Sequence, residues 1–371
     1  MDRYIAVDSG KFATKIACYD EKANKTLRMK FHTRMSEGFF EDDAIESATF
    51  VAKVGDKVYK IGRGARQQAD METSKKAEIH RVCTMAAIAM MCDPNAVDTV
   101  HVAVGIPVKA FEDVKTRNEY REYILPEGIN EVTIKKNSTS NPVTIKFEIK
   151  TRLVCPESCG VLYLHADKYK KASTGVVDIG NLNINGTVWS GFDLNPEYSV
   201  TNELGGNVLI QGIAQDLSAR FSRCDANMVA NILNKSKKNP DLRKLVPIKP
   251  NPLVEEESKK AITEYMRSHV RQIKAALDTK HWSLDYMNLV FIGGTSELLT
   301  NEIYEVFGEE VTIEEDPCYA NVLGFLMKLC SRTLKKAIPT STQDNTDSIG
   351  DNEEILQEDM KVEKQAAKKS A

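Results

Sequence analysis

Apolar runs that stop at glycine mark three expected strands along this chain. They cover residues 4–10, 175–180 and 289–294. Apolar, β-branched runs bounded by glycine are typical of strands in the interior of a sheet. The first two runs are each followed by a second strand pattern, at 13–19 and 184–189. A unit of strand, Asp-x-Gly turn and strand therefore occurs twice, once near the start of each half of the chain.

Helical patterns follow both units. Residues 74–92 are apolar nearly all round, as in a buried helix, and apolar residues recur at helical spacing between Leu204 and Phe221. A further helix is expected over 159–169. The alternation of strands and helices predicts an α/β architecture.

Two segments differ from this pattern. Residues 24–70 hold short strand candidates and many charges, and we interpret them as a small insertion on the first lobe. From Ile338 onward the chain is polar and has no aromatic residue. Such a composition cannot bury enough apolar surface to order a chain, so we predict that 338–371 is a disordered tail.

The overall composition is that of an ordinary globular protein, with 42% hydrophobic and 28% charged residues. A net charge of -3 gives no global attraction to nucleic acid. The longest apolar run, 85–91, is far shorter than the roughly 20 residues that span a bilayer. A strand pattern begins at once after Met1, so we expect no secretory signal. Eight scattered cysteines without a CxxC pair make a zinc site improbable and favour a reducing cytoplasm.

The turn after the first strand has residues that suit phosphate. A hairpin turn of small residues exposes backbone N–H groups that bind phosphate oxygens, and Gly10 permits close approach. Asp8 can hold a hydrated magnesium ion, and Lys15 can reach a phosphate as a point charge. An ordinary hairpin explains the same residues, since Asp and Gly are common in turns.

The second turn, with Asp178 and Gly180, repeats this logic. Two Asp-bearing hairpins that face each other across a cleft would clamp one magnesium–triphosphate, because the metal takes carboxylate, water and phosphate oxygens. The pair favours the functional interpretation over two unrelated turns.

Two further glycine-rich turns are weaker signals. The turn Gly293-Gly294-Thr295-Ser296-Glu297-Leu298 closes the third strand and is expected to open a helix, whose N-terminus suits a phosphate. Glu203 and Gly205-Gly206 precede another helix and suit a sugar or base. Each turn is equally well explained as a tight connection.

Glu157 stands after Pro156 and before the helix expected at 159–169. A carboxylate at a helix start is favoured by the helix dipole without any catalytic purpose. If the helix points into a nucleotide cleft, Glu157 is placed to orient an attacking water, because phosphoryl transfer needs mainly positioning and charge neutralisation.

Five segments together resemble the signature of the actin, heat-shock ATPase and sugar-kinase superfamily. They are Asp8–Lys15, Glu157–Leu164, Asp178–Thr187, Gly293–Leu298 and Ala320–Phe325. Gly105-Ile106-Pro107, the segment 57–62 and Pro156-Glu157-Ser158 resemble the ParM-type plasmid-segregation actins in particular. The resemblance implies an actin-like, two-lobed α/β fold built from duplicated ribonuclease H-like domains. Domain I would hold 1–165 and 318–337, with 24–70 inserted, and domain II would hold 166–317.

The resemblance also implies roles for single residues. Asp8 and Asp178 would be the magnesium-side, catalytic carboxylates, and Glu157 would serve hydrolysis. Nucleotide would be bound by Ser9, Gly10, Lys11, Phe12, Lys15, Gly180, Asn181, Leu182, Asn183, Glu203, Gly205, Gly206, Gly293, Gly294 and Thr295. The second turn departs from the family, because Asn181 replaces a glycine and Asn183-Ile184-Asn185 stands where Thr-x-Asp is expected.

The resemblance implies an ATP or GTP hydrolase that needs Mg²⁺ and polymerises head to tail into open helical filaments. Its partner in plasmid or prophage DNA segregation would be a DNA-binding adaptor of ParR type on centromeric DNA, without direct nucleic-acid or membrane contact. A small-molecule kinase or a chaperone-type ATPase of the same superfamily is the alternative. The chain shows no segment for a sugar pocket and no substrate-binding domain.

Overall fold

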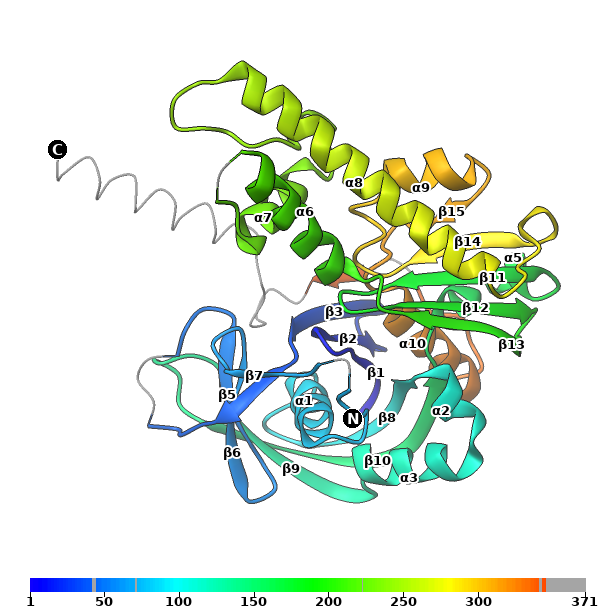
Figure 1. The fold of residues 1–371 in the computed structure, drawn as a ribbon. Helices are drawn as coiled ribbons and strands as arrows, with labels where there is room; N and C mark the ends of the chain where they lie inside the picture. The colour runs from blue at the N-terminus through cyan, green and yellow to red at the C-terminus, as the bar shows by residue number, and fades with distance from the viewer. Residues whose placement is uncertain (42–44, 71, 222, 340–341, 345–371) are drawn as a thin grey trace.

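Two β-sheets organise the molecule, which is seen here in a computed structural model (Figure 1). The structure describes residues 1–344 except 42–44, 71, 222 and 340–341. Within this described part of the chain, the larger sheet has 11 strands and the smaller sheet has five. Figure 1 shows the larger sheet with α1–α3 in one lobe and the smaller sheet with α6–α9 in the other.

The strand order of the larger sheet reflects both local hairpins and long crossovers. It runs β16 (Thr342–Asp344), β3 (Lys25–His32), β2 (Ala13–Asp20), β1 (Asp2–Ser9), β8 (Val97–Ile106), β10 (Val143–Pro156), β9 (Gly128–Lys135), β5 (Thr49–Val54), β6 (Lys57–Gly62), β4 (Arg34–Glu37) and β7 (Gln67–Gln68). The smaller sheet runs β13 (Asp193–Asn202), β12 (Ile184–Ser190), β11 (Ser173–Ile179), β14 (Asn288–Ile292) and β15 (Thr312–Ile313).

The helices of the described residues follow the sheets in sequence. They are α1 (Glu78–Met90), α2 (Val108–Glu112), α3 (Val114–Ile124), α4 (Gly160–Leu164), α5 (Ala166–Tyr169), α6 (Gly206–Arg220), α7 (Ala226–Ser236), α8 (Pro252–Asp278), α9 (Thr300–Phe307) and α10 (Ala320–Thr333), with short 3-10 turns at Pro240–Leu242 and Leu284–Tyr286. Capping side chains and proline help to determine where these helices begin. For example, Asn251 caps α8 by accepting from the backbone N–H of Val254, and Pro252 occupies the first turn. No described helix is both long and apolar enough to cross a membrane.

The two sheets share one local plan. In the larger sheet β1 pairs antiparallel with β2 and parallel with β8. In the smaller sheet β11 pairs antiparallel with β12 and parallel with β14. The register places Asp8 opposite Lys15 and Asp178 opposite Asn185. The repeated strand–turn–strand unit predicted from the sequence is therefore present in both lobes with the same pairing.

Each lobe has its own apolar core, and a third core joins them. The third core combines Tyr4 and Ala6 of β1 with Val176 of β11 and with the buried face of α10. Helices α4 and α10 touch through glycines, since a Cβ added at Gly324 would lie 1.9 Å from the Gly160 carbonyl oxygen. Only glycine allows backbones to approach this closely, so the pair sets how α10 sits between the lobes.

The segment after α10 corrects part of the tail prediction. Ile338 is only 7% exposed and belongs to the third core. Residues Thr342–Asp344 pair in parallel with β3, and Arg28 of β3 forms an ion pair with Asp344. The predicted polar tail thus contacts the body at its beginning, because one apolar side chain and a free strand edge are enough to hold it. Residues 345–371 lie outside the described residues.

One helix boundary differs from the sequence expectation. The small insertion predicted at 24–70 stays a prediction; its first strand, β3, pairs with β2 along its full length. The helix expected at 74–92 is shorter and covers Glu78–Met90. The two-domain boundaries remain a prediction.

Candidate functional site

The first candidate hairpin (residues 8–15) is closed by its own backbone. The N–H of Gly10 donates to the carbonyl oxygens of Asp8 at 3.0 Å and Ala13 at 3.1 Å. The Ser9 hydroxyl lies 3.1 Å from Nδ1 of His80 and 3.3 Å from the Thr14 hydroxyl. The Phe12 ring packs edge-on against His32. These contacts hold the turn in one conformation, as a preorganised phosphate site requires.

The second hairpin (residues 178–185) repeats this closure. The Gly180 N–H donates to the Asn183 carbonyl at 2.9 Å, which matches the Gly10 to Ala13 bond. The atypical asparagines are used inside the turn. The Asn183 amide lies 3.4 Å from Oδ1 of Asn185, which also accepts from the Thr201 hydroxyl at 2.9 Å. The departure from the family pattern therefore keeps the hairpin geometry intact.

The glycine-rich turns predicted for nucleotide converge on the second hairpin. The Gly206 N–H donates to the Gly180 carbonyl at 3.0 Å, and the Thr295 hydroxyl donates to the same oxygen at 2.9 Å. A Cβ added at Gly205 would lie 2.4 Å from the carbonyl carbon of Leu182, so glycine is required by this backbone contact. Gly293 has φ +90° and would place a Cβ 2.4 Å from Oδ1 of Asp178.

The remaining residues of this group are placed less centrally. A Cβ added at Gly294 would make only ordinary van der Waals contact, with Cys318 Sγ at 3.7 Å. Glu203 follows the end of β13 and is exposed. The helix expected to open from the turn 293–298 begins at Thr300, after consecutive turns held by bonds such as Leu298 N–H to Thr295 C=O. The turn therefore leads into a helix as predicted, while its role toward a phosphate stays a prediction.

The two aspartates occupy equivalent strand ends and have different surroundings. Asp8 is buried, and its Oδ2 lies 3.6 Å from Nζ of Lys15. Asp178 accepts from Nδ2 of Asn321 at 2.8 Å. Burial raises the pKa of Asp178 to about 6; Lys15 opposes this, and Asp8 and Glu157 add to it. The site therefore concentrates negative charge that a bound cation would offset.

Burial and the same carboxylates also shift the pKa of Lys15. Burial lowers its pKa, but the nearby Cys318 thiol and the carboxylates of Asp8 and Asp178 outweigh burial and raise the pKa above its usual value. Lys15 is thus a permanent cation between the two aspartates. Lys11, at the tip of the first hairpin, is half-buried, and burial followed by the charge of Lys75 lowers its pKa.

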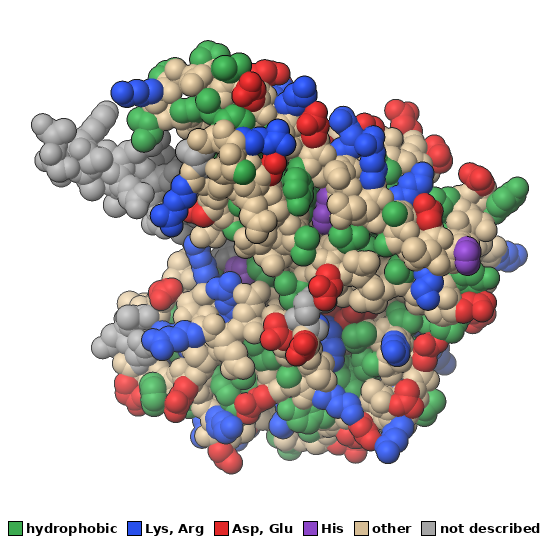
Figure 2. Space-filling view, in the orientation of Figure 1, with side chains coloured by type: hydrophobic (Ala, Val, Ile, Leu, Met, Phe, Trp, Pro, Cys, Tyr) green, Lys and Arg blue, Asp and Glu red, His purple; other side chains and the backbone are tan. Residues whose placement is uncertain are grey.

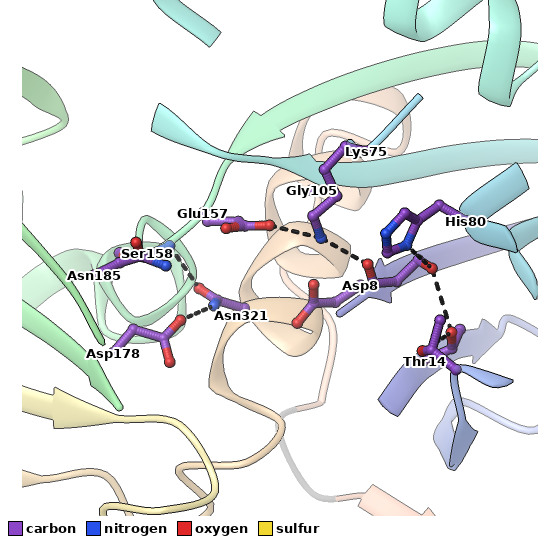
Figure 3. A network of polar contacts seen from close by, with 12 residues as sticks. Asp8, Thr14, Lys75, His80, Gly105, Glu157, Ser158, Asp178, Asn185 and Asn321 are labelled. Atoms are coloured by element: carbon purple, nitrogen blue, oxygen red, sulfur yellow. Dashed lines mark hydrogen bonds and ion pairs between the residues drawn. The ribbon is translucent and has the colours of Figure 1, made fainter. Parts of the chain in front are cut away.

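Glu157 lies just before a helix, as the sequence predicted. The helix predicted for 159–169 is divided into α4 and α5 at His165, and Glu157 lies before it in the turn after β10. The Glu157 N–H donates to the Ile106 carbonyl at 2.8 Å. Its carboxylate pairs with Nζ of Lys75 at 2.8 Å (Figure 3). The side chain is therefore held by a specific cation rather than by a helix dipole.

Two residues of this network escaped the sequence analysis. Asn321 of α10 links the lobes, because its Nδ2 donates to Asp178 while its Oδ1 accepts from the Ser158 N–H at 3.0 Å. It lay inside the recognised segment 320–325, but nothing in the sequence showed its partners. Lys75 lay inside a predicted helix and carried no signal at all. Figure 3 shows these side chains in one region with Asp8 and Asp178.

A hollow and a cavity lie near these side chains. Figure 2 shows that the surface is hollowed between the two lobes. A cavity of about 240 Å³ lies on the first-lobe side, where Lys11, Lys75, Ile106 and Tyr120 are among its lining residues. No group of three or more His, Cys, Asp or Glu side chains suited to a metal occurs among the described residues. A metal here would therefore depend on ligand and water oxygens besides the two aspartates.

Comparison with known families agrees with this geometry. Residues 6–160 match the family model described as "Actin like proteins N terminal domain". The chain has an actin-like fold. The actin-like resemblance and the two-lobed α/β prediction are thereby confirmed. No curated protein sequence matches the chain.

Solved structures extend the likeness over both lobes. An Alp12 filament structure is 22% identical, with 90% of this chain and 99% of that chain covered and a TM-score of 0.66. A Bacillus thuringiensis ParM with ATP is 16% identical, with 90% and 99% covered and a TM-score of 0.66. An archaeal actin homologue in complex with ADP is 17% identical, with 89% and 99% covered and a TM-score of 0.64. At these identities the likeness concerns the fold.

Proposed function

We propose that this actin-like protein binds ATP or GTP between its lobes, hydrolyses it, and assembles into filaments. The observation that carries the proposal is the pair of equivalent hairpins, each with an aspartate at the strand end and a glycine-closed turn. Together with Glu157, they supply two carboxylates on the metal side and one carboxylate for water. Solved structures of actin-like proteins with ATP or ADP support the proposal that this chain binds a nucleotide.

Magnesium fits the donor chemistry of this site. Carboxylate oxygens are hard ligands of the kind that Mg²⁺ takes beside water and phosphate oxygens. The raised pKa of Asp178, caused mainly by burial, supports the proposal, because an added cation would favour its ionised form. Asp8 and Asp178 would hold the ion, and the ion would neutralise charge on the phosphates. Of the other predicted nucleotide residues, Gly205, Gly206 and Thr295 contact the second hairpin, which supports the proposal.

Filament assembly is proposed from relatives whose names record it, an Alp12 filament and a ParM with a non-polymerisable mutant. In this proposal subunits polymerise head to tail in the triphosphate state, and hydrolysis then weakens the filament. The biological role would be plasmid or prophage segregation in the cytoplasm, through a ParR-type adaptor on centromeric DNA. An actin-like body with net charge -3 agrees with indirect contact to DNA.

Glu157→Gln separates the parts of this proposal. Phosphate release should fall about 10–100-fold, since one positioned carboxylate is lost, while nucleotide affinity stays close to the parental value. Light scattering after nucleotide addition should rise and then decay in the parent, but reach a lasting plateau in the variant.

The matched control is Glu131→Gln, an exposed glutamate on β9 that pairs only with solvent-exposed Lys146 among the described residues. It should behave like the parent. Parental hydrolysis in Glu157→Gln would remove Glu157 from the chemistry. Phosphate release without any scattering would exclude the filament and leave a non-polymerising kinase or chaperone-type ATPase.

A further inference from the structure

Lys75 joins two segments that are distant in sequence. It precedes α1, and its Nζ donates to the backbone carbonyl of Ser9 at 2.6 Å. The same Nζ lies 2.8 Å from Oε1 of Glu157. The first contact fixes it to the first hairpin, and the second fixes it to the turn after β10. One ammonium group therefore links a predicted phosphate-binding turn to the predicted water-orienting carboxylate (Figure 3).

Burial shows that this is not an ordinary surface ion pair. The side chains of Lys75 and Glu157 are only 10% and 13% exposed. The neighbouring Lys76 forms an ion pair with Glu119, but these side chains are 37% and 49% exposed. Buried ion pairs contribute little net stability, because desolvation of both charges opposes their attraction. Stability alone is therefore a weak reason for Lys75 to lie here.

Lys75 forms the ion pair with Glu157, and the charge of Lys11 also acts on this carboxylate. His80 contacts Ser9 from the other side through Nδ1. Burial, together with the charges of Lys75 and Lys11, lowers the pKa of His80 to about 3, so the imidazole is neutral at physiological pH. It orients the Ser9 hydroxyl and does not compete for the carboxylate. Since Lys75 binds Oε1, the second oxygen of Glu157 remains as an acceptor for water.

We propose that Lys75 is a positioning residue for nucleotide hydrolysis, which holds the Glu157 carboxylate at a fixed place relative to the first hairpin. The inference rests on the proposed hydrolysis. The ammonium of Lys75 is already engaged by the Ser9 carbonyl and by Glu157, so it acts on the nucleotide through Glu157. Its loss should therefore lower kcat and leave KM nearly unchanged.

The test compares variants of the full chain in a phosphate-release assay. Lys75→Met should lower kcat about 10-fold, with KM within about twofold of the parent, because misplacing a positioned group is costly. Lys75→Arg should restore most of the rate, since it keeps the cation. Lys76→Met, the exposed neighbour, is the control and should match the parent. In a Glu157→Gln background, Lys75→Met should cause no further loss, because both changes act on one unit.

Each other outcome overturns the inference. Parental kcat in Lys75→Met, or additive losses in the double variant, would show that Lys75 does not act through Glu157. A higher KM with unchanged kcat would show direct nucleotide contact instead. If Lys75→Met fails to fold, Lys75→Gln keeps a polar group near Ser9 and should show the same kcat loss; if both unfold, the role is structural. A parent that releases no phosphate refutes the proposed function as well.

Discussion

Asp178→Asn should stabilise the nucleotide-free protein while removing its affinity for magnesium–nucleotide. The folded protein raises the pKa of this carboxyl from its ordinary 3.8 to about 6, mainly by burial. At 1.36 kcal/mol per pKa unit, the ionised form costs at most about 3 kcal/mol of folding free energy. Asparagine has nearly the same shape and carries no charge, so the variant avoids this cost.

The sign of the pH dependence follows from the same shift. Because the folded pKa lies above the unfolded value, the carboxyl contributes stability that is fully present below pH 3.8 and lost as pH rises through about 6. The variant should therefore resemble the parent at about pH 4 and gain its full advantage at about pH 8. Lys15 keeps its charge throughout this range and retains Asp8 as its partner at 3.6 Å.

Urea unfolding without nucleotide or metal, at both pH values, measures the difference in unfolding free energy between the parent and Asp178→Asn. Calorimetry measures their nucleotide binding. Asp56→Asn, in the exposed turn between β5 and β6, makes the same chemical change away from the site. It should alter neither the unfolding free energy nor the nucleotide affinity. Equal or lower stability of Asp178→Asn at about pH 8 would refute the burial argument. Unchanged magnesium–nucleotide affinity would separately remove Asp178 from the binding site.

The remaining predictions concern the packing that holds the site. Gly324→Ala should lower the free energy of unfolding by about 3 kcal/mol, since its Cβ would meet the Gly160 carbonyl oxygen at 1.9 Å; thermal unfolding beside Ser331→Ala, on the exposed side of α10, checks this. Truncation after Lys336 should cost about 2 kcal/mol through loss of buried Ile338, whereas truncation after Asp344 should retain that contribution. Equal melting temperatures for the two truncations would show that the segment adds nothing.

The sequence by itself determined the local units of this protein. The strands that end at Gly10 and Gly180 are recognisable because apolar runs and turn glycines act over a few residues. Their aspartates could be paired as candidates because the same local pattern occurs twice. The structure bears out the two hairpins, while the roles of Asp8, Asp178 and Glu157 in nucleotide chemistry remain predictions.

Tertiary structure alone decided which distant residues meet. Lys75 reaches Glu157, and Asn321 reaches both Asp178 and Ser158, through crossovers whose geometry no local pattern encodes. The pairing of Thr342–Asp344 with β3 was missed because a polar segment can dock on a free strand edge through its backbone. The helix predicted over 159–169 is divided at His165, since tertiary packing overrides short-range propensity.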